Sequence, residues 1–184
     1  MSLATICRKS GEIVFSHKTR KRADDFDHPL VGGVDFDKSD FRDCVFEEIS
    51  FEHCCFEGAI ISGANVRRVS CNFVIMIDVD FRNSVVTDSI FYGGALDGIR
   101  FNGSIIENTA FHGVDLKNAS FEGVTFKNVT FRPDNLGVRT TFSFVSFKGA
   151  KFESVAFENV IYDNVIFPKS INPNEYPGLE PAAR

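Results

Sequence analysis

The sequence predicts an all-β protein whose chain winds into a narrow, filled tube, and three regularities in its 184 residues indicate this fold class. Apolar residues recur at every fifth position, which matches neither the 3.6-residue period of a helix nor the two-residue period of a flat strand. Small or uncharged residues stand two positions before each of them, and turn-forming residues stand two positions after many of them. A chain that turns the same way every five residues closes into a coil, and successive coils can stack.

The apolar positions at the centre of each repeat predict the inside of the tube. From Phe36 to Phe131 there are 20 such positions, all of them apolar and twelve of them Phe. Residues two apart on an extended segment point the same way, so each centre and its small partner face inward and the residue between them faces outward. The chain has 21 Phe and no Trp, which favours core building over binding surfaces.

The residues that follow each centre predict the corners. From Asp78 to Asn128 the position two after the centre is always Asp, Asn or Gly. These residues adopt a positive φ at low cost, as the second central residue of a type II turn requires. In the first third of the repeats this position is less regular and includes Lys38, Glu48 and Phe73. The corners in this first third are therefore compatible with another turn type.

The five-residue phase breaks once. After Phe131 the next regular centre is Phe142, so the step between them equals two repeats plus one extra position. The segment between them holds proline, aspartate, asparagine and glycine, which favour loops. We therefore expect a bulge or a small protruding loop within 132–141, followed by about one and a half further coils.

Several repeats are close copies of a known motif, and four of them read CVFEE (44–48), VDFRN (79–83), VDLKN (114–118) and ASFEG (119–123). They resemble the pentapeptide-repeat family, whose consensus is a small residue, Asp or Asn, Leu or Phe, and two variable residues. The resemblance covers roughly residues 34–167. It implies a right-handed, four-sided (quadrilateral) β-helix with four repeats per coil, and therefore about 6–7 coils.

Three regions follow from these patterns. Residues 1–33 are expected to form a small N-terminal hairpin, with its turn near residues 9–11, and a link that together cap the helix. Residues 34–167 form the β-helix with its loop near 132–141. Residues 168–184 hold four of the six prolines and are expected to form a C-terminal tail.

Catalytic, cofactor-binding and metal-binding residues are not predicted. Catalysis needs polar groups that converge in a cavity, and a tube filled with Phe leaves none. No phosphate-binding loop or nucleophile motif occurs in the sequence. We therefore expect a protein that is not an enzyme and needs no cofactor. Cys55 lies at an outward position, where a reactive thiol is the alternative to a plain surface residue.

Charge and hydropathy limit the partners and the location. The formal net charge of −5 argues against direct nucleic-acid binding, which requires a basic face. No segment has the length and apolarity of a membrane span, and the first residues lack the apolar run of a signal peptide. We expect a cytoplasmic protein that is a monomer or a weak dimer.

Two surface features are candidate interaction sites. With four sides, residues 20 apart stack, and one side gathers six acids against two lysines. We call these six the acidic column, namely Asp35, Asp37, Glu57, Asp78, Asp97 and Asp115. The alternative for them is a solvated face that keeps the rod soluble. The apolar patch is Phe73, Ile75 and Ile77, which occupy outward or corner positions, so that a partner or a capping segment of the same chain would cover them.

The leading functional hypothesis is a non-enzymatic interaction module, a rigid rod whose sides contact an unidentified protein partner. The alternative comes from the resemblance. One branch of the family imitates DNA with an acidic rod, modulates the type II topoisomerase gyrase and is linked to quinolone resistance. Members of that branch dimerise through a C-terminal helical module, whereas the tail of this chain is rich in proline.

Overall fold

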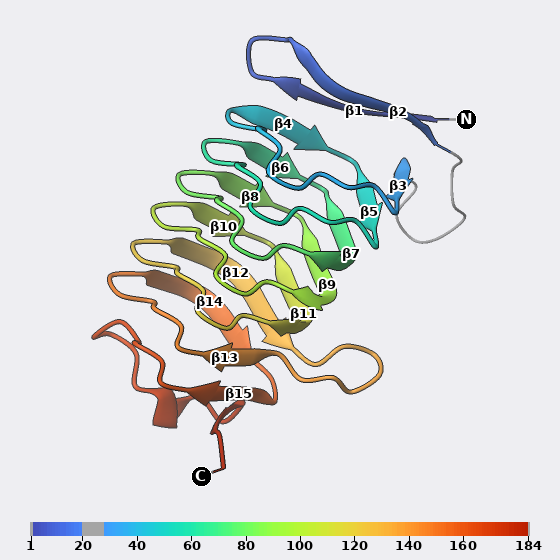
Figure 1. Ribbon diagram of the computed structural model, residues 1–184. Helices are drawn as coiled ribbons and strands as arrows, with labels where there is room; N and C mark the ends of the chain where they lie inside the picture. The colour runs from blue at the N-terminus through green and yellow to red at the C-terminus, as the bar shows by residue number, and fades with distance from the viewer. Residues whose placement is uncertain (1, 20–27, 184) are drawn as a thin grey trace.

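The computed structural model describes residues 2–19 and 28–183. The chain forms a right-handed, four-sided β-helix, in which each side is one five-residue repeat (Figure 1). Paired residues of successive coils are 20 positions apart, as in Val45 with Asn65 and Ile105 with Thr125. The all-β fold and the four-sided coil expected from the sequence are therefore confirmed.

Two sides of the helix carry the regular parallel ladders. One ladder contains β4 (Cys44–Glu47), β6 (Asn65–Arg67), β8 (Val85–Thr87), β10 (Ile105–Glu107), β12 (Thr125–Arg132) and β14 (Lys151–Phe157). The next side carries β3 (Leu30–Gly32), β5 (Ser50–Glu52), β7 (Ser70–Ile75), β9 (Ile90–Ala95) and β11 (Ala110–Asp115), followed by the second halves of β12 and β14. Six segments on one side and seven on the next agree with the expected 6–7 coils.

The other two sides are joined mainly by single bridges and main-chain hydrogen bonds, and one of them has a three-residue ladder, 141–143 with 161–163, near the C-terminal end. The Phe36 amide donates to the carbonyl of Cys55 at 2.7 Å, and the Phe41 amide donates to the carbonyl of Ile60 at 2.7 Å. The backbone groups of one coil are thus satisfied by the next, which a buried or half-buried backbone requires.

The corners share a positive φ. Every residue at five-residue spacing from Lys38 to Asn128 has a positive φ, including Lys38 at 55°, Glu48 at 54° and Phe73 at 52°. The less regular first third therefore has the same positive φ at its corners as the rest of the rod. Only some corners also have a turn hydrogen bond, such as that from the Ser39 amide to the carbonyl of Phe36 at 3.1 Å. A non-glycine residue in this region costs free energy, so the stacking of the coils imposes the conformation on Lys38, Glu48 and Phe73.

The interior is filled with aromatic rings. Phe91, Phe111 and Phe131 are fully buried, and their rings stack with centroid distances of 4.9 Å and 5.0 Å. One void of about 10 Å³ lies in the interior and is lined by apolar side chains from residues 46–91. This volume is barely enough for one water molecule. A larger hollow of about 570 Å³ lies at the last coils, beside Phe167 and Lys169, and is open to solvent.

The break in the repeat is larger than the sequence suggested. Phe131 pairs with Phe157, and Asp115 pairs with Thr141, so this coil advances the chain by 26 positions instead of 20. Six residues are added, not the single extra residue that counting in steps of five indicated. Phe142 occupies the side directly after Phe131, and the inserted residues form a loop that projects from the rod between β12 and β13 (Thr141–Ser143) (Figure 1).

Both ends of the helix are covered. At the N-terminal end, β1 (Ser2–Arg8) and β2 (Ile13–Thr19) form the expected hairpin, whose turn holds Gly11 at φ 91°. Strand β1 also pairs antiparallel with β4, and so covers the first coil. Part of the link expected after the hairpin, residues 20–27, lies outside the described residues.

At the C-terminal end the tail folds back on the last coil. It contains a short 3-10 helix (Pro173–Glu175), and β16 (Leu179–Pro181) pairs with β15 (Val160–Asp163). Tyr176 packs edge-on against Phe157 at 5.5 Å, and Leu179 is buried. Among the described residues, no helix combines the length and the apolarity that a membrane crossing needs.

The stacked rings lead to a stability prediction. Replacing Phe111 by Ala should lower the free energy of unfolding by about 3–5 kcal/mol, because the coils on either side are held apart by their backbone ladders and cannot collapse into the gap. Denaturant unfolding of the two proteins measures the difference. A loss below about 1 kcal/mol would show that the ring is not part of the core.

Candidate interaction surface

The apolar patch lies at one corner of the rod and on the side that follows it. Phe73 is the corner residue and is 43% exposed, and Ile75 is exposed to the same extent. Ile77 is only half-buried rather than exposed, so two side chains supply most of the accessible apolar surface. Ile75 stacks between Cys55 and Ala95, which extends the apolar character to the coils above and below.

Neighbouring rings fix the position of Phe73. Its ring stacks on His53 at 5.6 Å and meets Tyr92 edge-on at 5.5 Å. The same ring lies over Gly93, where a Cβ would come within 2.7 Å of a ring carbon. Gly93 thus has two reasons to be glycine, its φ of 55° and the ring above it. The position of the exposed face of Phe73 is consequently fixed by its neighbours in the rod.

Acidic side chains lie along the same side of the rod as Ile75 and Ile77. Five members of the acidic column are exposed and Asp97 is half-buried. Ile77 stands in the outward column between Glu57 and Asp97, since the amides of Gly58 and Asp78 donate to the carbonyls of Ile77 and Asp97. None of the ion pairs within the described part of the chain includes one of these six carboxylates. No ion pair within the described residues therefore neutralises their charge.

Some of these carboxylates also support the backbone. Asp35 accepts a hydrogen bond from the amide of Asp37 at 2.9 Å, and Asp37 accepts one from the amide of Glu57 at 2.9 Å. Asp115 accepts from the hydroxyl of Thr141 at 2.8 Å. The column is thus partly a feature of the repeat itself, in which the residue before the centre holds the turn.

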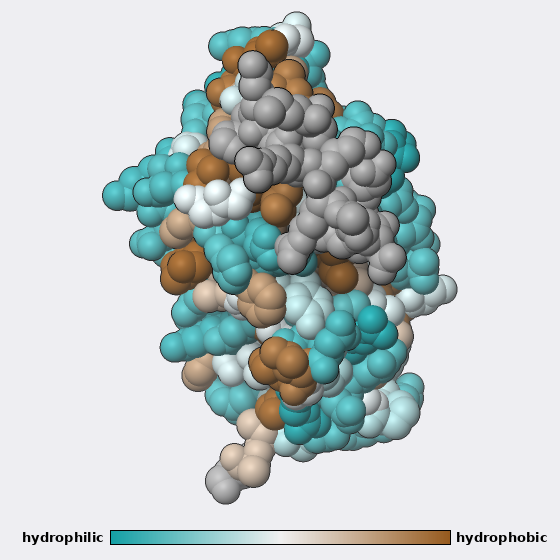
Figure 2. Space-filling model, turned by 90° about the vertical axis from the view of Figure 1, so that its right-hand side faces the viewer, coloured by the Kyte–Doolittle hydropathy of each residue, from teal (hydrophilic) through white to brown (hydrophobic). Residues whose placement is uncertain are grey.

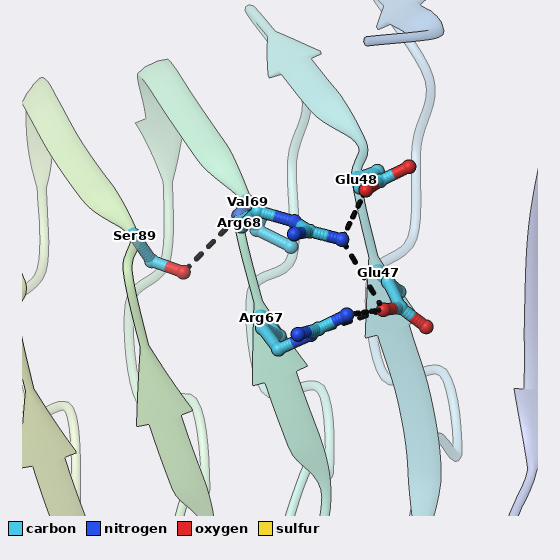
Figure 3. Close-up of polar contacts among 6 residues, drawn as sticks. All are labelled: Glu47, Glu48, Arg67, Arg68, Val69 and Ser89. Atoms are coloured by element: carbon cyan, nitrogen blue, oxygen red, sulfur yellow. Dashed lines mark hydrogen bonds and ion pairs between the residues drawn. The ribbon is translucent and has the colours of Figure 1, made fainter.

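A different side of the rod shows the opposite arrangement (Figure 3). There Glu47 and Glu48 stack over Arg67 and Arg68, and the Arg67 Nε donates to Glu47 at 3.0 Å. The guanidinium of Arg67 lowers the pKa of Glu47 through this hydrogen bond. Charges on this side are neutralised within the chain, whereas those of the acidic column are not.

A row of rings continues from the patch to the projecting loop. Tyr92 meets His112 at 6.4 Å, and the Tyr92 hydroxyl accepts a hydrogen bond from the amide of Asn135 at 3.1 Å. The sequence patterns did not predict this row. The spacing that could have identified it is close to the 20 residues of one coil, and it joins His53, Phe73, Tyr92 and His112. Figure 2 shows the side from which the loop projects, where apolar groups stand among polar ones.

The loop is ordered by a buried carboxylate. Asp134 accepts hydrogen bonds from the amides of Leu136 at 2.9 Å and Val138 at 2.8 Å. Thr140 is fully buried and donates to the carbonyl of Arg132 at 2.8 Å. The loop nevertheless leaves Leu136 81% exposed. An apolar side chain held out on an ordered loop suits contact with another molecule.

Cys55 lies next to the apolar patch and beside two acids. Its sulfur and carboxylate oxygens of Asp37 and Glu57 all lie within 4.8 Å of one another, so the three residues offer three ligand atoms on an accessible face. Burial, and then the hydrogen bond to Asp37, raise the pKa of the Cys55 thiol. A raised pKa lowers the thiolate fraction, which speaks against the reactive-thiol interpretation.

Taken together, these features define a β-helical repeat rod with a filled interior, whose accessible chemistry is on its sides. A family model described as pentapeptide repeats matches residues 32–68 and 96–132 with eight copies. The chain belongs to the pentapeptide-repeat family.

Similar solved structures come from the same family, whereas no curated protein sequence matches the chain. One is QnrB1, a plasmid-mediated fluoroquinolone resistance protein, at 16% identity over 83% of this chain and 89% of that chain, with a TM-score of 0.34. Another is alr5209 from Nostoc PCC 7120, at 16% identity over 67% and 84%, with a TM-score of 0.32. HetL from the same organism, involved in heterocyst differentiation regulation, gives 12% identity over 83% of each chain and a TM-score of 0.26.

His112, which packs against Tyr92, leads to a prediction on pH. His112 is buried and its Nε2 accepts a hydrogen bond from Arg132 Nε at 2.8 Å. Burial, and then the charge of Arg132, lower the pKa of His112 from 6.5 to about 4. Because the unfolded chain binds this proton more readily, this histidine should reduce stability by about 2–3 kcal/mol as the pH falls from 6.5 to 4.

Unfolding of the wild type and of His112→Gln across this pH range measures the effect. Glutamine keeps an acceptor for Arg132 but does not titrate, so the difference in stability between the two proteins should change with pH. A constant difference would contradict the assignment.

Proposed function

We propose that the protein is a non-enzymatic interaction module, a rigid rod that presents its sides to a protein partner. The observation that carries the proposal is the exposed apolar patch, in which the ring of Phe73 is held between the rings of His53 and Tyr92. Exposed apolar side chains on an ordered surface are typical of sites that bind another protein. The filled interior supports the same proposal, since the void between the described coils, about 10 Å³, is far smaller than a substrate.

A second candidate is a DNA mimic that modulates gyrase, as in the branch of the family linked to quinolone resistance. The acidic column favours it, because carboxylates without ion-pair partners along a rod resemble a line of phosphates. Two observations weigh against it. Several of the carboxylates accept backbone hydrogen bonds within the chain. The tail forms a short 3-10 helix and a strand instead of a helical dimerisation module.

Affinity capture from the native cell lysate tests the interaction module. The wild-type rod should retain a partner protein at a fixed stoichiometry, and excess untagged rod should compete for that partner. Retention that no excess of untagged rod reduces would count against the proposal, because it would reflect non-specific adsorption.

A gyrase supercoiling assay separates the two candidates. The wild-type protein should neither inhibit the enzyme specifically nor protect it. The matched variant carries Asp78→Asn, Asp97→Asn and Asp115→Asn, which removes three charges while keeping the size and the acceptor oxygen of each side chain. Potent inhibition by the wild type that this variant loses would place the DNA mimic first, because charge mimicry depends on these carboxylates.

A further inference from the structure

The apolar patch and the acidic column form one surface. Ile75 and Ile77 lie in the two outward columns of the same side. Acids flank Ile77 directly, and in the column of Ile75 they follow one coil farther out on either side. In one column the order along the rod is Asp35, Cys55, Ile75, Ala95 and Asp115. In the other, Ile77 lies between Glu57 and Asp97, with Asp78 beside it.

Protein interfaces commonly have an apolar centre and a polar rim. Here the nearest charged members of the rim, Glu57, Asp78 and Asp97, all have the same sign. The lysines of this side, Lys38 and Lys117, lie farther along the rod, one at the first coil and one beyond Asp97. A partner that placed acids or a purely apolar face here would leave these carboxylates repelled or desolvated without a counter-charge.

We propose that this side binds a basic amphipathic segment of a partner protein, in which apolar side chains cover Ile75 and Phe73 while flanking Lys or Arg residues meet Glu57, Asp78 and Asp97. The inference rests on the proposed interaction function and names its surface and the chemistry of its partner. It differs from charge mimicry because the apolar centre is required as well as the rim. The fixed ring of Phe73 lowers the entropy lost on binding.

The chain supplies a matched control for the apolar centre. Ile105 occupies the same position in its repeat as Ile75, directly before the central residue, and the two residues are 42% and 43% exposed. Ile105 lies on a different side, in the ladder of β8, β10 and β12. Replacing either isoleucine by Ser removes the same type of exposed side chain. A difference in peptide binding between the two variants therefore depends on where the isoleucine lies on the rod.

The rim has a matched control of the same kind. Asp78 and Asp88 are both corner residues with a positive φ, 56° and 52°. Asn occupies many equivalent corners, including Asn108 and Asn118, so Asp→Asn keeps the backbone conformation at either site. Asp78 borders the patch, whereas Asp88 lies on the side of Ile105 and accepts a hydrogen bond from Asn108 at 3.1 Å.

The probe is a fluorescein-labelled peptide with a Leu-Phe-Leu core flanked on each side by two arginines, followed by fluorescence anisotropy with the full chain. We expect saturable binding that weakens as salt rises from about 0.05 M to about 0.5 M. Ile75→Ser should weaken binding about tenfold or more, since a central apolar contact is lost. Asp78→Asn should weaken it less and reduce its dependence on salt. Ile105→Ser and Asp88→Asn should leave binding unchanged.

Three results would overturn the inference: no saturable binding of the peptide, equal losses for Ile75→Ser and Ile105→Ser, or a salt dependence that Asp78→Asn does not alter. Capture from lysate distinguishes this failure from that of the interaction function. If the Ile75→Ser variant still retains the partner and the peptide does not compete, the protein is an interaction module but binds its partner through another surface. If excess untagged rod displaces no protein from the captured wild type, the proposed interaction function itself is contradicted.

Discussion

The alignment of each coil on the one before it, with counterparts 20 positions apart, governs the rest of this structure. Because each coil takes its backbone hydrogen bonds from the coils beside it, every side chain is placed directly above its counterpart in the previous coil. The Phe rings then stack closely, as for Phe91 and Phe111 at 4.9 Å. The same alignment imposes a positive φ on Lys38 and Phe73, which on their own would avoid it.

Most of the fold could be predicted from the sequence because its pattern is local and repeated. A period of five, an apolar centre and a small inner partner identify the inside of each side, as Phe126 and Val124 illustrate. The number of sides came from resemblance to a family. The insertion after Phe131 could not be measured by counting, because the step to Phe142 fits two repeats plus one extra position as well as it fits one repeat plus six. Only the pairing of Phe131 with Phe157 decides between these.

The candidate surface could be predicted only in part. Outward positions identified Phe73 and Ile75, and stacking of successive coils identified the acids, but the partial burial of Ile77 depends on its neighbours in space. The row of rings from His53 to His112 joins different positions of the repeat, so a search along one column does not find it. The loop that exposes Leu136 has no counterpart in the repeat, and its order comes from the buried carboxylate of Asp134.

The enlarged coil shows how the rod tolerates change. The six additional residues project from the rod at one corner, and the chain then returns to the next side. The parallel pairing continues before and after the loop, as Phe131 with Phe157 and Asp115 with Thr141 show. Residues can thus be added to the chain in two independent ways. Whole coils lengthen the rod along its axis, whereas loops inserted at a corner leave the length of the rod unchanged. A designer who grafts a foreign peptide between Arg132 and Thr141 would use an opening that this architecture already contains.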